Sequence, residues 1–154
     1  MQLKRVLVSV IASLSLFSAT ANANVKIFSS SSSQNLCTDI QGQWIGNGTV
    51  TARFMGVKIR CDYAGDTYIT GAEDFSADIH LHLTSGICPA AEDFIMPGIC
   101  NGNTGMISLE SDEANLSGTL SNDGKQVNFT GTVNIPMGGT TVVGTVERME
   151  LHKV

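Results

Sequence analysis

Residues 116–146, LSGTLSNDGKQVNFTGTVNIPMGGTTVVGTV, decide the fold that the sequence predicts. Within this stretch, Gly-Thr followed by Leu or Val begins at Gly118, Gly131 and Gly144, thirteen residues apart each time. One strand and one tight turn together occupy a segment of about this length. The repeat therefore predicts a β-meander, in which each strand pairs with the next one along the chain.

Two turns set the register of this meander. Asp-Gly at 123–124 is the strongest short signal for a hairpin turn, and it places Gly118 opposite Phe129. Gly-Gly at 138–139 predicts the next turn independently. Both turns give the same result: the apolar side chains and the three glycines share one face, and the threonines share the other. The shared face predicts the interior of the domain.

Strands are also predicted outside the meander. Apolar and polar residues alternate in 39–63, 75–84 and 106–110, with a further short strand at 67–70, whereas the glycines, prolines and acidic residues of 86–105 predict a loop. No amphipathic helix is predicted. We therefore expect an all-β domain with an antiparallel up-and-down meander of seven to eight strands, most simply a small closed barrel, with a β-sandwich as the alternative.

The N-terminal part of the chain predicts export. Residues 1–23 contain two basic residues, an apolar run and the small-x-small pattern Ala21-Asn22-Ala23, which is typical of a signal peptide and its cleavage site. Residues 24–36 include five consecutive serines and are predicted to be a flexible leader. Residues 37–154 then form a single β-domain. We expect a periplasmic or extracellular protein.

Charge and hydropathy narrow the choice of partners. Removal of the signal peptide takes away Lys4 and Arg5 and no acidic residue, which changes the formal net charge from −5 to −7. An acidic chain without a cluster of basic residues is a poor partner for nucleic acid and for anionic membranes. No later segment is long and apolar enough to span a bilayer. We therefore expect no nucleic-acid binding and no membrane insertion.

The chain has four cysteines, Cys37, Cys61, Cys88 and Cys100. An even number in an exported protein predicts a disulfide framework. Three pairings are possible, and the prediction favours Cys37–Cys61 and Cys88–Cys100 because each joins neighbours across one turn or loop. Closing the second loop stabilises the fold by roughly 3 kcal/mol in the chain-entropy description. The Cys-x-x-Cys spacing of many zinc sites does not occur.

The first predicted strand carries a family resemblance. Gly42-Gln43-Trp44 resembles the Gly-x-Trp that opens lipocalins and, with variation, avidins and other calycin barrels. In lipocalins an arginine late in the chain packs over that tryptophan, and Arg148, expected on the same side as Val146, takes its place in the resemblance. The Thr-Asp-Tyr signature of the lipocalins and their C-terminal helix are missing. The resemblance implies a small secreted β-barrel.

The predicted inner face gives the first functional hypothesis. Glycine at inward positions leaves volume that can become a ligand space in a closed barrel. The alternative is that the glycines let the strands bend, with Phe129 covering Gly118. The hypothesis is an exported, non-catalytic binding protein that holds a small apolar molecule and needs no cofactor. Its candidate ligand-binding residues are Trp44, Gly118, Phe129, Gly131, Gly144 and Arg148.

The predicted disulfide loop from Cys88 to Cys100 gives the second hypothesis. It carries Phe94, Ile95 and Met96, and a constrained loop that presents apolar groups meets part of its ordering cost before binding. The alternative function is therefore a secreted protein-interaction factor, such as an inhibitor, an adhesion factor or a host-facing effector. The same three residues could instead cap one end of the barrel.

Metal binding and catalysis have fewer candidates. Asp78, His80 and His82 alternate along one predicted strand, so they share a face at about 6.5 Å spacing, and such a set can bind zinc or copper. Alternate polar residues on a strand more often simply face water, and His152 is the one further ligand candidate. The cysteines are expected to be oxidised, and Ser85 has no Gly-x-Ser-x-Gly context. No catalytic site is predicted.

Overall fold

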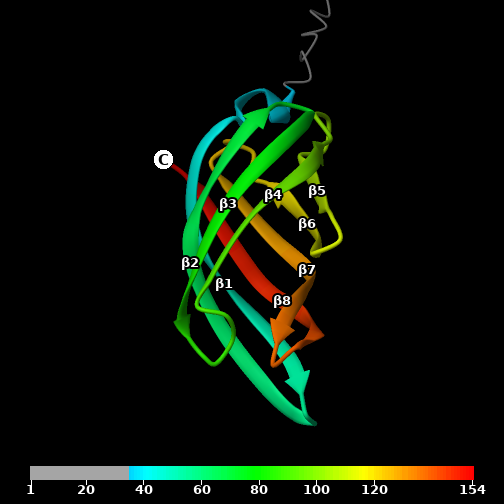
Figure 1. Ribbon diagram of the computed structural model, residues 1–154. Helices are drawn as coiled ribbons and strands as arrows, with labels where there is room; N and C mark the ends of the chain where they lie inside the picture. Colours follow the sequence, from blue (N-terminus) through cyan, green and yellow to red (C-terminus); the bar gives the residue numbers. More distant parts are fainter. Residues whose placement is uncertain (1–34) are drawn as a thin grey trace, which may run out of the picture. The chain divides into compact units, whose positions relative to one another are not determined.

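The computed structural model describes residues 35–154, which form a closed antiparallel barrel (Figure 1). The predicted signal peptide and most of the predicted leader lie outside the described residues. A short 3-10 helix, η1 (Leu36–Asp39), precedes eight strands. The strands are β1 (Gly42–Phe54), β2 (Val57–Gly71), β3 (Asp74–Ser85), β4 (Ala91–Cys100), β5 (Met106–Glu110), β6 (Ala114–Leu120), β7 (Gln126–Met137) and β8 (Thr140–Lys153).

Each strand pairs with the next, and β8 pairs with β1 to close the barrel. Closure leaves no terminal strand unpaired along its whole length, which removes the main aggregation hazard of an open sheet. Inward and outward residues alternate along the strands, as the burial pattern of β3 shows most regularly. The predicted up-and-down closed barrel is confirmed, with eight strands.

The predicted register of the meander is also confirmed. Gly118 lies opposite Phe129, and Gly131 lies opposite Val146. The three glycines fall on the inner face, whereas the threonines that follow them are exposed. The two glycine-containing turns therefore define inside and outside correctly for β6, β7 and the first half of β8.

A β-bulge interrupts β8 after Val146. Two residues, 147 and 148, stand opposite Thr130 alone. The extra residue reverses the alternation, so that inward positions are even-numbered up to Val146 and odd-numbered from Met149 onward. Arg148 therefore points outward, and the prediction that it shares the inner side of Val146 is wrong. Alternation extrapolated along a strand cannot reveal a bulge.

Residues 86–105 contain a strand that the sequence analysis assigned to a loop. β4 pairs with β3 over nearly its whole length, but only residues 98–100 pair with β5. Pro97 lies just outside this second pairing, where its missing N–H leaves no ladder bond unmade. Phe94 and Met96 alternate as inward residues along this strand, but Pro97 and Gly98 led the sequence to be interpreted as a loop.

The favoured disulfide pairing, Cys37–Cys61 and Cys88–Cys100, is wrong. The bonds join Cys37 to Cys100 and Cys61 to Cys88, with Cα separations of 6.0 and 6.1 Å. Cys37 and Cys100 belong to the buried cluster beneath η1, whereas Cys61 and Cys88 belong to a second cluster elsewhere in the barrel. Proximity in sequence misled the prediction because an antiparallel barrel carries neighbouring segments to opposite ends.

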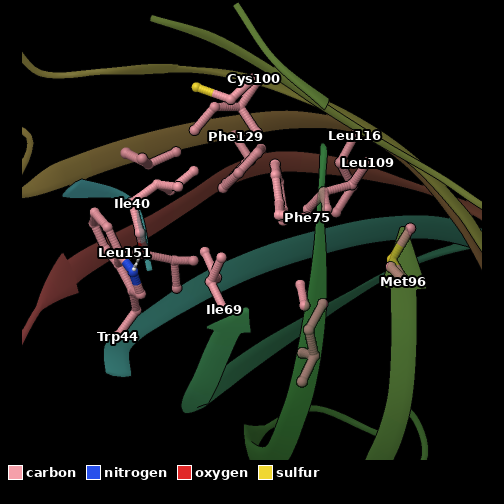
Figure 2. Close-up of a cluster of buried hydrophobic side chains, with 14 of the residues drawn as sticks. Ile40, Trp44, Ile69, Phe75, Met96, Cys100, Leu109, Leu116, Phe129 and Leu151 are labelled. Carbon is pink, nitrogen blue, oxygen red and sulfur yellow. Dashed lines mark hydrogen bonds between the residues drawn. The ribbon is translucent and has the colours of Figure 1, made fainter. Parts of the chain in front are cut away.

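The two clusters divide the interior. The larger one lies beneath η1, which covers one end of the barrel, and we call this the capped end (Figures 1 and 2). Figure 2 shows its side chains pointing into the space between the strands. The smaller one includes Tyr63, Ile135 and Met137, and lies toward the β1–β2 and β7–β8 hairpins; we call this the hairpin end. Val50 and Val133 contact both clusters.

Candidate functional site

The capped end is packed solid. Ile40 and Trp44 are fully buried, and the Trp44 indole Nε1 donates a hydrogen bond to the Ile40 carbonyl oxygen at 2.8 Å. Asn35 and Leu36, from the end of the predicted leader, are held here, since Leu36 N–H donates to Gly102 O at 2.9 Å. Trp44 therefore closes the barrel as a core residue, and it lines neither of the two interior spaces described below.

A different basic residue takes the place expected of Arg148. The ammonium of Lys153 lies 6.0 Å from the centroid of the Trp44 ring and donates to the Asp39 carbonyl oxygen. That distance is within the range of a cation–π contact. Arg148 instead contacts the carboxylate of Glu150 on the outer surface. A basic side chain therefore contacts Trp44 as predicted, but it is Lys153 and not Arg148.

The repeat glycines do not hold open a ligand space. A Cβ atom on Gly118 would lie 2.8 Å from a ring carbon of Phe129, and one on Gly144 would lie 2.7 Å from the side chains of Ile135 and Val50. A Cβ on Gly131 would overlap a backbone carbonyl oxygen. These positions are filled by their neighbours, as in the alternative in which Phe129 covers Gly118.

An empty space borders glycines of β1 and β2 instead, although a Cβ on Gly46 or Gly65 would also overlap a backbone carbonyl oxygen, so the space lies beside these positions. Gly46 pairs with Gly65 across the two strands, and both face inward together with Gly48. They border a small apolar cavity of about 50 Å³ at mid-barrel, between the two core clusters. We call it the inner cavity. The sequence has glycine at the alternate positions 46 and 48, but only the pairing of Gly46 with Gly65 shows that these glycines border a cavity.

A larger space opens through the barrel wall beside the inner cavity. It lies between β4 and β7, below the turn that joins β5 to β6, and its volume is about 330 Å³. We call it the side pocket. It shares lining residues with the inner cavity, so that the two spaces adjoin. The shared residues are Val50, Tyr63, Leu81, Phe94 and Val133.

The side pocket exists because β5 and β6 are short. Figure 1 shows both strands close to the end that carries η1. On the β7 side the turn is fastened, since Asn134 N–H donates to Glu113 O and its side-chain amide donates to Asp112 O, both at 2.7 Å. On the β4 side, residues 91–97 pair with β3, but within residues 35–154 no strand pairs with their other edge. A longer β5–β6 hairpin would fill this part of the wall.

The free edge of β4 carries the backbone N–H and C=O groups of its odd-numbered residues. Leu83 N–H donates to Ala90 O at 2.8 Å, so even-numbered residues of β4 bond to β3. Asn101 N–H donates to Met106 O at 2.8 Å, so odd-numbered residues face the other side. Within residues 35–154, no backbone partner is recorded on that side for the odd-numbered residues Ala91, Asp93 and Ile95.

The charged side chains of the side pocket are all acidic, and Tyr63 and Asn134 add two neutral polar groups. Glu92, Asp93 and Glu113 line it, and no lysine, arginine or histidine of the described chain does so. Glu92 faces inward because it is in phase with Phe94. Burial raises the pKa of the Glu92 carboxyl, and the neighbouring charge of Asp93 raises it further. The alternation of Glu92 with Phe94 and Met96 was readable from the sequence, but it was missed because the segment was taken for a loop.

Tyr63 forms the wall opposite the acidic edge. Its hydroxyl donates a hydrogen bond to the Pro89 carbonyl oxygen at 3.1 Å, which fixes the ring against the β3–β4 connection. Burial raises the pKa of the Tyr63 hydroxyl, and the charge of Glu92 raises it further. Tyr63 and Glu92 both line the side pocket.

The residues of the proposed interaction loop are placed differently from what that hypothesis requires. Met96 is fully buried in the core, and Phe94 points inward to line both spaces. Only Ile95 faces outward, with 69% of its surface exposed. The three residues therefore do not form one apolar surface, because successive residues of a strand point to opposite faces.

Asp78, His80 and His82 lie on the outer face of β3. The His80 ring nitrogens both meet carboxylates, with Nδ1 3.0 Å from Asp93 Oδ1 and Nε2 3.5 Å from Asp78 Oδ1. The hydrogen bond to Asp93 raises the pKa of His80, and the charge of Asp78 adds to the effect. This arrangement favours an imidazolium, which has no lone pair for a metal. Within residues 35–154, no three His, Cys, Asp or Glu side chains are grouped as metal ligands.

The remaining observations concern the chain as a whole. Within residues 35–154, no helix combines the length and the apolar character that crossing a bilayer requires. Comparison of the chain with protein-family models, with characterised proteins and with solved structures finds no match. The geometry of the barrel therefore carries the functional argument by itself.

Proposed function

We propose that the protein binds a small, largely apolar molecule in the side pocket, with the apolar end of the ligand directed toward the inner cavity. The observation that carries the proposal is the side pocket itself, an opening of about 330 Å³ that adjoins the inner cavity in a barrel whose capped end is packed. Its volume lies at the lower end of the range found for ligand pockets. Its lining is mainly aliphatic and aromatic.

The proposed activity is binding without catalysis. The lining of the side pocket contains no serine, threonine, cysteine or histidine, so no aliphatic hydroxyl or thiol nucleophile lies there beside an imidazole base; its titratable groups are three carboxylates and the Tyr63 hydroxyl. Both disulfides suit an oxidising compartment, and we place the protein in the periplasm or outside the cell. A small secreted barrel with an apolar opening is also what the resemblance to the calycins implies.

A series of straight-chain alcohols from butanol to octanol tests the proposal. Each buried methylene contributes about 0.8 kcal/mol, so the affinity should rise about fourfold per added carbon until the space is full. Methyl chemical shifts in nuclear magnetic resonance spectra report the site, and we expect shifts at Leu81 and Val133. The absence of such shifts up to the solubility limit of every alcohol would refute the proposal.

Two variants locate the binding. Val133→Phe places a ring in the space that both cavities share, so it should weaken alcohol binding at least tenfold. Val143→Phe is the matched control, because Val143 lies on the outer face of β8 with 64% of its surface exposed. Equal loss in both variants would show that the alcohols bind elsewhere. If Val133→Phe does not fold, the methyl chemical shifts of the unaltered chain still show whether the alcohols bind in the side pocket.

The free edge of β4 favours a second candidate function, the addition of an extended segment of a basic partner protein as a further strand. Ala91, Asp93 and Ile95 present unpartnered backbone groups there, and Glu92, Asp93 and Glu113 supply negative charge. An alternating Lys-Val peptide is a suitable probe. Ile95→Pro removes one edge N–H without removing a bond to β3, so it should abolish peptide binding and leave the fold intact. Unchanged binding would refute this function.

A further inference from the structure

We propose that the ligand of the side pocket is a cation: a small apolar molecule with a protonated amine or quaternary ammonium group, held with its charge beside Glu92. The inference rests on the proposed function and adds the chemical class of the ligand. It depends on three observations, namely the inward direction of Glu92, the absence of basic groups from the lining, and the aromatic rings that face the same space.

Glu92 points into an apolar wall without a partner. It precedes Phe94 and Met96 in the inward series of β4, so the pleat of the strand directs its carboxylate toward the pocket. Within residues 35–154, it makes no recorded side-chain hydrogen bond or ion pair. Solvent still reaches this carboxylate, because no fully buried polar side-chain atom of residues 35–154 lacks a hydrogen-bond partner. A cationic ligand would supply the missing partner.

The charges around the pocket favour a positively charged ligand. Basic residues of the described chain are engaged on the outer surface, since Arg60 lies 3.2 Å from Asp62, Lys58 lies 3.8 Å from Glu147, and His80 lies 3.0 Å from Asp93. Neither lysine nor arginine lines the pocket. A cleft with charges of one sign and apolar walls concentrates ions of the opposite sign. The pocket should therefore favour cations and reject fatty acids and other apolar anions.

The three carboxylates are not equivalent. Asp93 also contacts the imidazole of His80 on the outer face, at 3.0 Å. Glu113 lies on the exposed β5–β6 turn, where solvent screens its charge. Glu92 combines an inward direction with partial burial, and so its charge is the least compensated of the three. We assign the main contact with the cation to Glu92.

Aromatic rings complete the site. Tyr63 and Phe94 both line the side pocket, and the hydrogen bond to Pro89 holds the Tyr63 ring in place. The faces of aromatic rings attract cations, and a quaternary ammonium group gains from this without needing hydrogen bonds. The site thus offers a carboxylate and two aromatic rings to the charged group, and aliphatic side chains to the rest of the ligand.

Four probes built on a six-carbon chain test the inference: hexylammonium, hexyltrimethylammonium, hexanol and hexanoate. Affinities are measured at pH 7 and low salt, from the methyl shifts of Leu81 and Val133. Both cations should bind about tenfold more tightly than hexanol, because solvent weakens a charge pair at a partly exposed site. Hexanoate should bind more weakly than hexanol. Added salt should reduce the differences.

Glu92→Gln assigns the preference to one residue. This variant should bind the cations no more tightly than it binds hexanol. Glu110→Gln is the matched control, because it removes the same charge at an exposed position outside the pocket lining. It should keep the preference for cations.

The outcomes separate the inference from the proposed function. If hexanol and both cations bind equally well, the inference is overturned and the apolar pocket stands. The inference also fails if the preference survives in Glu92→Gln. If none of the four probes shifts the pocket methyls, both the inference and the proposed function fail.

Discussion

The capped end and the hairpin end of this barrel differ in how they are filled. At the capped end, η1 brings Ile40 over Trp44, and every large side chain beneath them is buried. Beyond the capped end, the short β5–β6 hairpin leaves the wall incomplete, and Tyr63 and Phe94 line the side pocket that opens there. One end therefore supplies stability, and the space near the other is available for binding. Stability and binding can lie in different parts of one closed sheet because its strands differ in length.

Each end has its own disulfide. Cys37–Cys100 fastens η1 to the last residue of β4 and so holds the cap in place. Cys61–Cys88 fastens the β3–β4 connection to β2 beside the second cluster. The connection also accepts the Tyr63 hydroxyl hydrogen bond at Pro89. The second disulfide thus stabilises the scaffold on which one wall of the side pocket is built.

Truncating Trp44 in the cap and Phe94 in the wall of the side pocket should give the largest contrast. Trp44→Ala removes a fully buried indole and should lower the free energy of unfolding by about 3–5 kcal/mol. Phe94→Ala enlarges a space that already exists, and it should cost about 1–2 kcal/mol. Urea unfolding of both variants measures the difference. Equal losses would mean that the pocket wall is packed as tightly as the cap.

Adding volume should sharpen the contrast in the opposite direction. Gly144→Ala would press on Ile135 and Val50, so overpacking should cost about 1–3 kcal/mol. Val133→Leu adds the same single methylene beside the side pocket and should change stability by less than about 1 kcal/mol. Thermal unfolding of the two variants provides the measurement. A loss in Val133→Leu as large as that in Gly144→Ala would contradict the hollow interior.

These contrasts also show where sequence reasoning succeeded. The register from Leu116 to Val146 was predicted correctly because glycine-containing turns fix it locally and the hydrophobic pattern agrees with both turns. The closed barrel follows from the strand count and the tight connections. These are properties of neighbouring residues, so one sequence contains them.

Sequence reasoning failed where a result depended on pairing between distant segments. The disulfides depend on which end of the barrel each cysteine reaches, and the position of Arg148 depends on a bulge that pairing with β1 and β7 defines. The inner cavity depends on Gly46 meeting Gly65. The side pocket depends on the length of β5 relative to β4. None of these relations is local in the chain.

The smallest expected effect concerns the charge that reaches the side pocket from the outer face. Asp93 lines the pocket and accepts a hydrogen bond from His80, which raises the pKa of His80 above its usual 6.5. A raised pKa in the folded state gives stability that is fully present below the unfolded value. That stability is lost as the pH rises through the folded value.

A titration of His80 measures this effect, which should be small because the side chain is exposed to solvent. Its ring resonances should titrate above pH 6.5 in the original chain, and Asp93→Asn should lower that midpoint, because it removes the first cause of the shift. The melting temperature of the original chain should decline slightly over the same pH window, and His80→Gln should remove that decline. An unchanged midpoint in Asp93→Asn would mean that Asp93 is free of His80, so that its full negative charge would act on the pocket. The preference for cations would then be shared between Asp93 and Glu92, and Glu92→Gln alone would reduce it only in part.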